Sequence, residues 1–305
     1  MNTFNALLKI EHLSITEIES LIEQALKFKK NKNIPKLKKD IFIANLFFEN
    51  STRTHKSFEI AQKKLGFNVI NFESESSSIK KGETLYDTVL TLNCLNVDCF
   101  VIRHSDKEYY NELINSKNFT SKLINAGDGV GEHPTQSLLD LMTIYENFKT
   151  FKNLKIAICG DLKHSRVAHS NMKILNKLGA KIYFSGPKEW FEESYLEYGE
   201  YKNIDDLIHE VDVLMLLRVQ NERHIDRLNN NINYLSEYGL NRDRYNSLKE
   251  NAIILHPCPV NRNVEIESSL VESEKSKIFT QMNNGLYMRM AILYYMYKDD
   301  FNDIN

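Results

Sequence analysis

The 305-residue chain lacks the features that mark membrane, secreted and nucleic-acid-binding proteins. Its formal net charge is only −2, which gives no reason to expect nucleic acid or a membrane surface as a partner. No apolar run approaches the roughly 18 residues of a membrane span, and Met1–Ile10 lacks the layout of a signal peptide. These absences favour a cytoplasmic protein.

Cysteine is also scarce, and the four present are widely spaced. Cys94, Cys99, Cys159 and Cys258 form no CxxC pair and have no histidine at zinc-finger spacing. We expect each to serve as a small apolar residue in or near a strand or helix, reduced as thiols are in the cytoplasm. The sequence therefore predicts no bound metal.

Apolar runs and helical patterns alternate along the chain, which predicts an α/β fold with parallel sheets flanked by helices. A polar hinge at Lys149–Asn153 separates two such alternations. The first set has expected strands at 41–48, 68–72, 99–102 and 123–125, with helices at 84–95, 107–113 and 135–148. The second set has expected strands at 155–159, 181–184, 213–217 and 253–255, with a helix at 165–178.

These patterns divide the chain into two domains, residues 1–149 and 150–284, and a C-terminal helix at 285–305. Apolar residues of the last segment recur at helical spacing, at Leu286, Met290, Leu293 and Tyr297. This spacing predicts an amphipathic helix that begins after Gly285 and packs back across the first domain.

One strand–turn–helix segment carries a polar turn, Ser51-Thr52-Arg53-Thr54, before a helix that stops at Gly66. Backbone N–H groups at a helix N-terminus bind anions. Hydroxyls donate to oxygen atoms, and a guanidinium binds phosphate bidentately. The turn is therefore either a phosphate site or an ordinary capped helix start, because serine and threonine are also common N-caps.

The residues around this turn resemble a known signature. F-x-E-x-S-T-R-T, followed by S-F-E-x-A, is similar to the carbamoyl-phosphate signature of the transcarbamoylase family. The resemblance implies that Ser51, Thr52, Arg53 and Thr54 bind carbamoyl phosphate, with Arg53 and Thr54 also catalytic. His55 stands where many members have arginine, one position beyond the ligands, so we expect it to be tolerated.

Two more motifs of the first half match this family. Arg103 ends a strand, where a charge is also explained by the solvated mouth of the sheet. H-P-T-Q at residues 133–136 opens a helix, and a histidine before proline is by itself explained as a cap. The resemblance implies that Arg103 joins Arg53 around the phosphate and is catalytic. It also implies a catalytic His133 that donates to the carbonyl oxygen as charge develops, and a Gln136 that holds the amide end of carbamoyl phosphate.

The loop S-S-I-K-K-G-E-T at residues 77–84 is rich in hydroxyls and cations. By itself it is explained as a solvated loop, but it is similar to a loop of the aspartate branch that enters the active site of a neighbouring subunit. The resemblance implies that Ser77 and Lys81 serve an adjoining protomer, with Lys81 in catalysis and aspartate binding. It also implies a homo-oligomer with shared sites, which we expect to be a trimer.

The second half carries motifs that suit the acceptor substrate. Arg166 lies in the turn G-D-L-K-H-S-R-V, and R-V-Q-x-E-R begins at Arg218; alone, these are a strand-to-helix turn and a charged strand mouth. Both resemble aspartate-binding segments of the family, which implies that Arg166, Arg218 and Gln220 bind aspartate. Together with Lys81, these arginines suit a dicarboxylate and repel the side-chain ammonium of ornithine.

H-P-C-P-V-N-R at residues 256–262 follows the last expected strand and, by itself, is explained as a rigid turn. Ornithine-type members usually show H-C-L-P here, whereas this chain resembles the aspartate type. The resemblance implies that Cys258 and Pro259 belong to the carbamoyl-phosphate site, with Cys258 contributing its backbone carbonyl.

The resemblance covers nearly the whole chain and implies the catalytic chain of an aspartate carbamoyltransferase. Such enzymes pass the carbamoyl group of carbamoyl phosphate to the α-amine of L-aspartate, an early step of pyrimidine synthesis, without a cofactor. One alternative is an ornithine-type enzyme. Another is an inactive scaffold of the same fold, which would be expected to lose active-site residues that this chain retains. Whether regulatory chains bind is left open.

Overall fold

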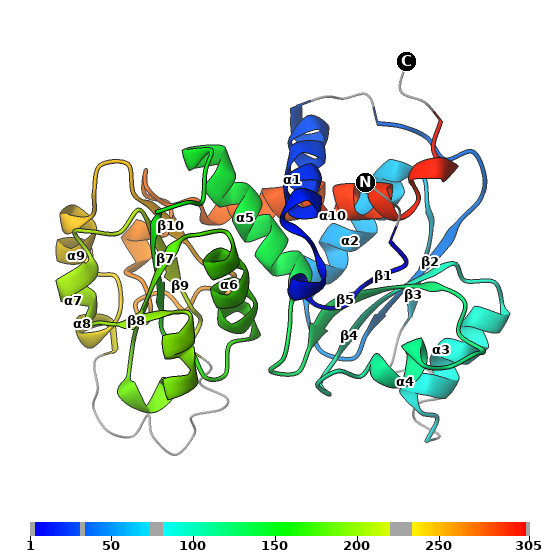
Figure 1. Cartoon of the computed structure of the whole chain (residues 1–305), viewed down its shortest axis with the longest axis horizontal. Coiled ribbons are helices and arrows are strands. Elements are labelled where there is room, and N and C mark those ends of the chain that lie inside the picture. The colour runs from blue at the N-terminus through cyan, green and yellow to red at the C-terminus, as the bar shows by residue number, and fades with distance from the viewer. Residues whose placement is uncertain (1–3, 31–33, 73–81, 220–233, 303–305) are drawn as a thin grey trace. The chain divides into compact units, whose positions relative to one another are not determined.

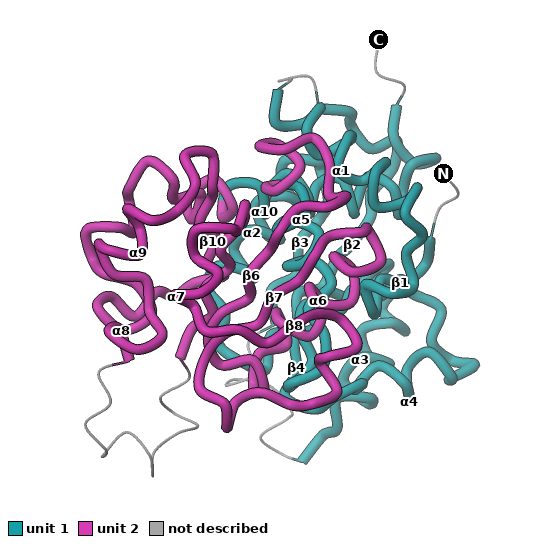
Figure 2. Tube along the Cα trace, turned by 60° about the vertical axis from the view of Figure 1, so that its left-hand side comes forward, with its two compact units in different colours: residues 1–142, 283–305 teal, residues 143–282 magenta. Residues whose placement is uncertain are grey.

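The computed structural model describes residues 4–30, 34–72, 82–219 and 234–302. They form two compact units, which we call unit 1 (residues 1–142 and 283–305) and unit 2 (residues 143–282; Figure 2). Each unit contains a five-stranded sheet in which every neighbouring pair of strands is parallel. The predicted α/β class is therefore confirmed. Within the described residues, no helix is long and apolar enough to span a membrane.

The sheet of unit 1 has the strand order β1-β5-β4-β2-β3. Figure 1 shows α1, α2 and α10 on one face of this sheet and α3 and α4 on the other. The strands are β1 (Ala6–Leu7), β2 (Phe42–Phe47), β3 (Asn68–Phe72), β4 (Cys99–His104) and β5 (Lys122–Asp128). The helices are α1 (Ile15–Lys30), α2 (Thr52–Leu65), α3 (Leu85–Cys94) and α4 (Asn111–Ile114), and α5 (Pro134–Phe148) and α10 (Ile278–Met296) cross from one unit into the other.

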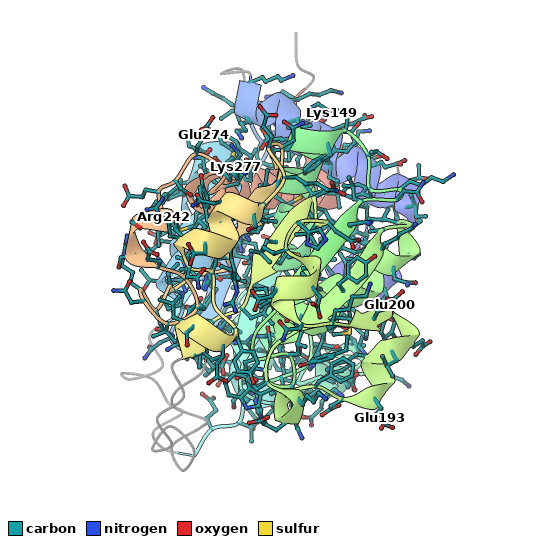
Figure 3. The ribbon with its side chains drawn as sticks, turned by 90° about the vertical axis from the view of Figure 1, so that its left-hand side faces the viewer. Lys149, Glu193, Glu200, Arg242, Glu274 and Lys277 are labelled. Atoms are coloured by element: carbon teal, nitrogen blue, oxygen red, sulfur yellow. The ribbon has the colours of Figure 1, made fainter. Side chains whose placement is uncertain are left out.

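The sheet of unit 2 has the order β10-β9-β6-β7-β8. In Figure 1, α6 covers one face of it and α7, α8 and α9 lie on the other side. Acidic and basic side chains, among them Lys149, Glu193 and Arg242, point outward over this unit (Figure 3). The strands are β6 (Lys155–Cys159), β7 (Lys181–Ser185), β8 (Gly199–Tyr201), β9 (Val213–Leu216) and β10 (Ile253–Leu255). The helices are α6 (Arg166–Lys177), α7 (Ile204–Leu207), α8 (Tyr234–Glu237) and α9 (Arg242–Ser247).

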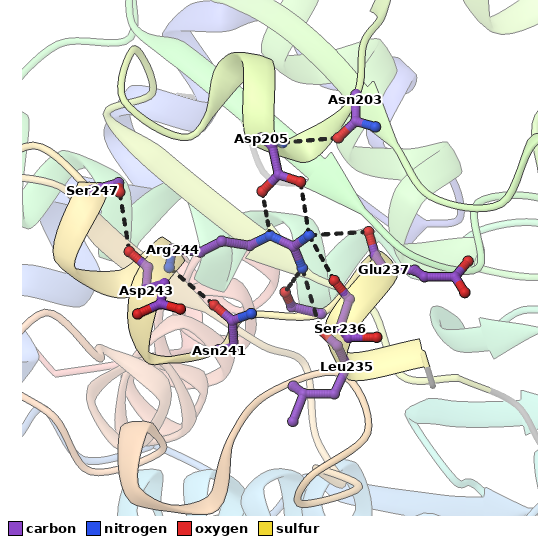
Figure 4. Close-up of polar contacts among 10 residues, drawn as sticks. Asn203, Asp205, Leu235, Ser236, Glu237, Asn241, Asp243, Arg244 and Ser247 are labelled. Atoms are coloured by element: carbon purple, nitrogen blue, oxygen red, sulfur yellow. Dashed lines mark hydrogen bonds and ion pairs between the residues drawn. The ribbon is translucent and has the colours of Figure 1, made fainter. Parts of the chain in front are cut away.

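Three of these helices are too short to be stable alone, and a buried arginine holds them together (Figure 4). Arg244 of α9 forms a two-pronged ion pair with Asp205 of α7, with N···O distances of 2.6 and 2.9 Å. It also donates to backbone carbonyl oxygens in and after α8, those of residues 235, 236, 237 and 239. A cation at carbonyl groups that end a helix satisfies their unpaired acceptors.

Helix α10 differs from its prediction at its start, at its end and in its burial. It ends at Met296, whereas the predicted segment ran to residue 305. It begins at Ile278, so Gly285 lies inside it. All six residues Met288–Leu293 are buried, so this part of the helix has no solvent-exposed polar face; five of the six are apolar and the sixth is Arg289. It does pack on unit 1, as predicted: Tyr294 meets Phe28 of α1 edge to face, with ring centroids 5.6 Å apart.

The helix predicted at 107–113 is also shorter, because α4 covers only Asn111–Ile114. Glu108 has a left-handed φ of 56°, which an α-helix cannot contain. Its N–H donates instead to Asp128 Oδ2 at 2.8 Å, which ties the turn to the end of β5.

Candidate active site

In unit 1 the predicted phosphate-binding residues follow three neighbouring strands. Strand β4 lies between β2 and β5, and Arg103 near its end pairs in register with Phe47, the last residue of β2. The chain after β2 leads into Ser51–Thr54, and the chain after β5 leads into His133–Gln136. Because the carboxyl ends of parallel strands share one edge, where open α/β sheets bind ligands, these segments lie on the binding edge.

The first turn of α2 is not capped by its serine. Ser51 occupies the N-cap position and its carbonyl accepts from His55 N–H at 3.0 Å, but among the described residues its side chain makes no capping hydrogen bond. At the start of α6, by contrast, Ser165 Oγ accepts from Ala168 N–H at 3.2 Å. The ordinary-cap alternative therefore does not account for the Ser51 hydroxyl.

Arg103 is held at the strand edge by acceptors on both sides. Its Nε lies 3.2 Å from Glu49 Oε2, and Nη1 donates to Ala126 O at 3.4 Å. The side chain is largely buried, with 13% of its surface exposed. Sequence reasoning gave Glu49 no role, although it is the fixed glutamate of the F-x-E-x-S-T-R-T pattern.

His55 makes a ring contact and a hydrogen bond that an arginine at this position would not make in the same way. Its ring stacks on Phe47 with centroids 4.7 Å apart. Its Nε2 lies 2.9 Å from Asn71 Oδ1, which also accepts from Asn45 Nδ2 at 3.1 Å. The imidazole is thereby tied to β2 and β3, next to the polar turn.

The start of α5 is buried and polar. His133 is 4% exposed, Thr135 is fully buried and Gln136 is 8% exposed. Gln136 N–H donates to His133 O at 2.9 Å, and its side-chain Nε2 donates to Asp140 Oδ1 at 2.9 Å. Pro134 is the first residue of the helix, where its missing N–H costs nothing.

In unit 2 the predicted aspartate-binding residues again follow neighbouring strands, β6 and β9, with β10 beside them. Arg166 is the first residue of α6, and Arg218 follows β9. Gly160 follows β6 with a φ of 129°, and a Cβ there would lie 3.1 Å from Leu217 Cβ and 3.1 Å from Leu217 O. Only glycine allows this approach, which places the turn after β6 against the residue before Arg218.

The loop after β10 is organised by a buried histidine and glutamate. Cys258 N–H donates to His256 Nδ1 at 2.9 Å, so the ring proton must sit on Nε2, which lies 3.0 Å from Glu265 Oε1. The same oxygen accepts from Asn261 N–H at 2.7 Å, and Asn261 Nδ2 donates to Val219 O at 3.0 Å. This network fixes the backbone around Cys258 and ties it to the segment that contains Arg218.

The sequence motif at the last strand includes His256, Asn261 and Glu265, but sequence reasoning gave these residues no role. The feature that could have indicated their supporting role is the presence of polar side chains in a proline-flanked turn. Ser77, Lys81 and Gln220 lie outside the described residues, so their predicted roles stay predictions. Among the described residues, no cluster of three or more His, Cys, Asp or Glu side chains is arranged to hold a metal ion.

The cysteines are free thiols, in agreement with their spacing. Cys99 and Cys159 are buried in strands β4 and β6, and burial raises the pKa of each thiol to about 12. A thiol with such a pKa is protonated at neutral pH, so neither is a nucleophile. Cys94 is exposed, and Cys258 is partly buried.

The two units, each with arginine residues at or just after its strand ends, match a known family of transferases along almost the whole chain. Residues 5–146 match its carbamoyl-phosphate-binding domain, and residues 152–296 match its aspartate- or ornithine-binding domain. This chain belongs to the aspartate/ornithine carbamoyltransferase family.

Among its relatives, the aspartate carbamoyltransferase catalytic subunit of Streptococcus mutans is 56% identical over 94% of each chain. That of Listeria welshimeri is 57% identical over 96% of each chain. Among solved structures, aspartate transcarbamoylase of Trypanosoma cruzi with carbamoyl phosphate bound is 32% identical over 96% of each chain, with a TM-score of 0.87. The catalytic subunit of the M. jannaschii enzyme is 33% identical, covers 97% of this chain and 99% of its own, and has a TM-score of 0.85.

Proposed function

We propose that this chain transfers the carbamoyl group of carbamoyl phosphate to the α-amine of L-aspartate, giving N-carbamoyl-L-aspartate and phosphate for pyrimidine synthesis. The observation that supports the reaction type is the group of arginine, hydroxyl and histidine residues at or after the ends of the neighbouring strands β2, β4 and β5. The acceptor is indicated by the relatives, since catalytic subunits named for aspartate are 56–57% identical to this chain.

Unit 1 takes carbamoyl phosphate in this proposal. The hydroxyls of Ser51, Thr52 and Thr54 and the N–H groups of the first turn of α2 receive the phosphate oxygens. Arg53 and Arg103 neutralise its two negative charges. His133 donates to the carbonyl oxygen, where negative charge develops in the tetrahedral transition state.

Unit 2 takes the acceptor. Arg166 and Arg218 follow β6 and β9 and suit the two carboxylates of aspartate, with Gln220 and a neighbouring subunit's Lys81 completing the set. The carbonyl of Cys258, with Pro259 beside it, receives N–H groups of the carbamoyl group and the attacking amine. The His256–Glu265 pair supports this role because it fixes the backbone at Cys258.

The reaction forms a C–N bond and breaks the bond between the carbonyl carbon and the oxygen atom that links it to phosphorus. The amine nitrogen of aspartate attacks the carbonyl carbon, and phosphate leaves with the bonding electron pair. In this proposal the departing phosphate takes the amine proton, because none of the assigned side chains is an evident general base. Alignment and charge neutralisation then supply most of the rate.

We further propose that the working enzyme is a cytoplasmic homotrimer with shared sites, in which Ser77 and Lys81 act in an adjoining protomer. The loop motif at residues 77–84 supports this assembly. Four free thiols fit a reducing compartment.

The test is formation of ureido product by the purified chain with carbamoyl phosphate, with aspartate and ornithine offered in parallel. We expect turnover with aspartate and none with ornithine. Turnover with ornithine would mean that the Arg218 segment has been misinterpreted. No turnover with either, together with no binding of a mimic that joins a phosphonate to a succinate, would favour the scaffold alternative.

A further inference from the structure

A buried carboxyl group lies at the start of the loop between β5 and α5. Asp128 is the last residue of β5 and is fully buried. The loop ends at Glu132 and His133, which are 5% and 4% exposed. The fold thus places an aspartate that none of the proposed binding steps uses in the segment that leads to His133.

Three N–H donors reach this carboxyl group from different parts of unit 1. Asp128 Oδ2 accepts from the backbone N–H of Glu108, in the turn after β4, at 2.8 Å. Asp128 Oδ1 accepts from Nδ2 of Asn125 in β5 at 3.3 Å, and from the backbone N–H of Glu132 in the loop. Both carboxyl oxygens are therefore acceptors, and none of the three N–H donors can accept in return.

Asp128 holds both backbone polar groups of Glu132. Its side chain accepts from the N–H of Glu132, and its own N–H donates to the C=O of Glu132 at 3.2 Å. That C=O belongs to the peptide group that joins Glu132 to His133, and a peptide group is planar. The direction in which the chain enters His133 is therefore set by Asp128.

The other side of His133 is fixed by the helix that follows it. His133 O accepts from the N–H of Gln136 at 2.9 Å and from that of Ser137 at 3.2 Å. These two bonds tie His133 to the first turn of α5. Asp128 and α5 together fix the main chain on both sides of the histidine, which leaves only its side-chain torsions to place the ring.

Gly131 leaves the space that the carboxyl group occupies. A Cβ at Gly131 would lie 2.8 Å from Asp128 Oδ2, closer than real Cβ atoms come, and 3.0 Å from Oδ1. The φ of Gly131 is not in the left-handed range, so the Asp128 side chain, and not the backbone, disfavours a larger residue there. The loop is therefore built around this carboxyl group.

We propose that Asp128 is a positioning residue for His133: through the backbone of Glu132 it holds the imidazole where negative charge develops on the carbonyl oxygen of carbamoyl phosphate. The inference rests on the carbamoyl-transfer function proposed above. It adds a residue that does not touch the substrate. Asp128 acts on the chemical step more than on phosphate binding, because a donor to a developing charge stabilises the transition state more than the ground state.

The test separates the chemical step from phosphate binding. Asp128→Asn keeps the shape of the side chain, but in either orientation its NH₂ group meets an N–H donor. We expect kcat with carbamoyl phosphate and aspartate to fall about tenfold to a hundredfold, the effect of misplacing a catalytic group by about 1 Å. The inhibition constant of inorganic phosphate, which has no carbonyl group for His133 to bind, should stay unchanged.

A double-mutant cycle shows whether Asp128 acts through His133. His133→Ala removes the proposed donor, so adding Asp128→Asn to it should lower kcat no further. Gly131→Ala keeps the carboxyl group but pushes it from its place, so it should also lower kcat, and it provides the measurement if Asp128→Asn fails to fold. Asp106→Asn makes the same change at a side chain that is 75% exposed in the turn after β4; it is the matched control and should keep the wild-type kcat.

A wild-type kcat in Asp128→Asn or in Gly131→Ala would overturn the positioning role. So would a loss of phosphate binding as large as the loss of kcat, or effects of Asp128→Asn and His133→Ala that multiply in the double variant. Wild-type protein that forms no ureido product would instead contradict the proposed function, and this inference with it.

Discussion

Ser51 and Ser165 each occupy the N-cap position of a helix, yet only Ser165 uses its side chain as a cap. The difference separates two roles that sequence alone left open for Ser51. A serine that caps a helix contributes to folding stability. A serine whose hydroxyl makes no such bond can bind a ligand, which for Ser51 we propose to be the phosphate of carbamoyl phosphate.

We therefore predict opposite effects for two alanine substitutions. Ser165→Ala should lower the free energy of unfolding by about 1 kcal/mol, because a capping hydrogen bond is lost. Ser51→Ala should lower it by less than about 0.5 kcal/mol, since no cap is removed, but should raise the KM for carbamoyl phosphate about tenfold or more. Urea denaturation and initial rates measure the two quantities. A Ser51→Ala protein as unstable as Ser165→Ala, with an unchanged KM, would show that Ser51 is an ordinary cap.

Candidate site residues could be proposed from the sequence, whereas the residues that support them in the fold could not. Polar motifs beside strand ends contain Arg53, His133 and Arg218. In that position the sequence favours a functional role at least as much as a structural one. Arg289 stands among apolar residues at helical spacing, which gives no sign that the guanidinium is buried. Its hydrogen-bond partner Thr135 is 154 positions away in sequence, so only the fold brings the two together.

At the scale of elements, most strands were predicted, including the edge strands β3 and β10, and the two short edge strands β1 and β8 were missed. Strands β3, β6 and β10 have the predicted limits. The buried strands β6 and β10 are nearly continuous apolar runs, which is the pattern that predicts a buried parallel strand. The edge strands β1 and β8 have two and three residues and carry no such pattern. Helices α7, α8 and α9 were also missed, because contacts to Arg244 stabilise them rather than any local period.

The Arg244 contacts predict a weakening of unit 2 in acid. The hydrogen bond from Arg244, and then its charge, hold the pKa of Asp205 below its ordinary value of 3.8. A carboxyl with a lowered folded-state pKa contributes stability above 3.8, and that contribution is lost as the pH falls through 3.8 toward the folded-state pKa. Asp205→Asn should therefore cost about 1 kcal/mol at neutral pH, a modest value because Asp205 is well exposed.

Urea midpoints between pH 7 and pH 3 test this. The gap between wild type and Asp205→Asn should narrow as the pH falls through 3.8 toward 3, since protonation of Asp205 then removes the wild-type advantage. Asp206→Asn, one residue further along α7, is the control and should show no such convergence. A constant gap over the whole range would contradict the assigned cause.

At the scale of the whole molecule, the proposed function requires that each of the two units bind one substrate. Sequence motifs predicted this division, because the phosphate-binding pattern precedes the hinge and most of the acceptor-binding pattern follows it. The structure adds that each set of predicted binding residues follows neighbouring strands of its own sheet. This arrangement depends on the strand order, which is set by pairing between distant parts of the sequence and is not encoded by any local motif. What each unit binds remains a proposal.

The most direct test of this division is to measure the two substrates separately in Arg53→Ala and Arg218→Ala. Calorimetry with phosphonoacetamide, a stable phosphonate analogue of carbamoyl phosphate, reports on the first substrate, and the aspartate KM at saturating carbamoyl phosphate reports on the second. We predict that Arg218→Ala leaves phosphonoacetamide binding unchanged and raises the aspartate KM by about ten- to a hundredfold, the loss of a charged hydrogen-bonding partner. Arg53→Ala should abolish phosphonoacetamide binding. Weaker phosphonoacetamide binding in Arg218→Ala, or an unchanged aspartate KM, would contradict the account.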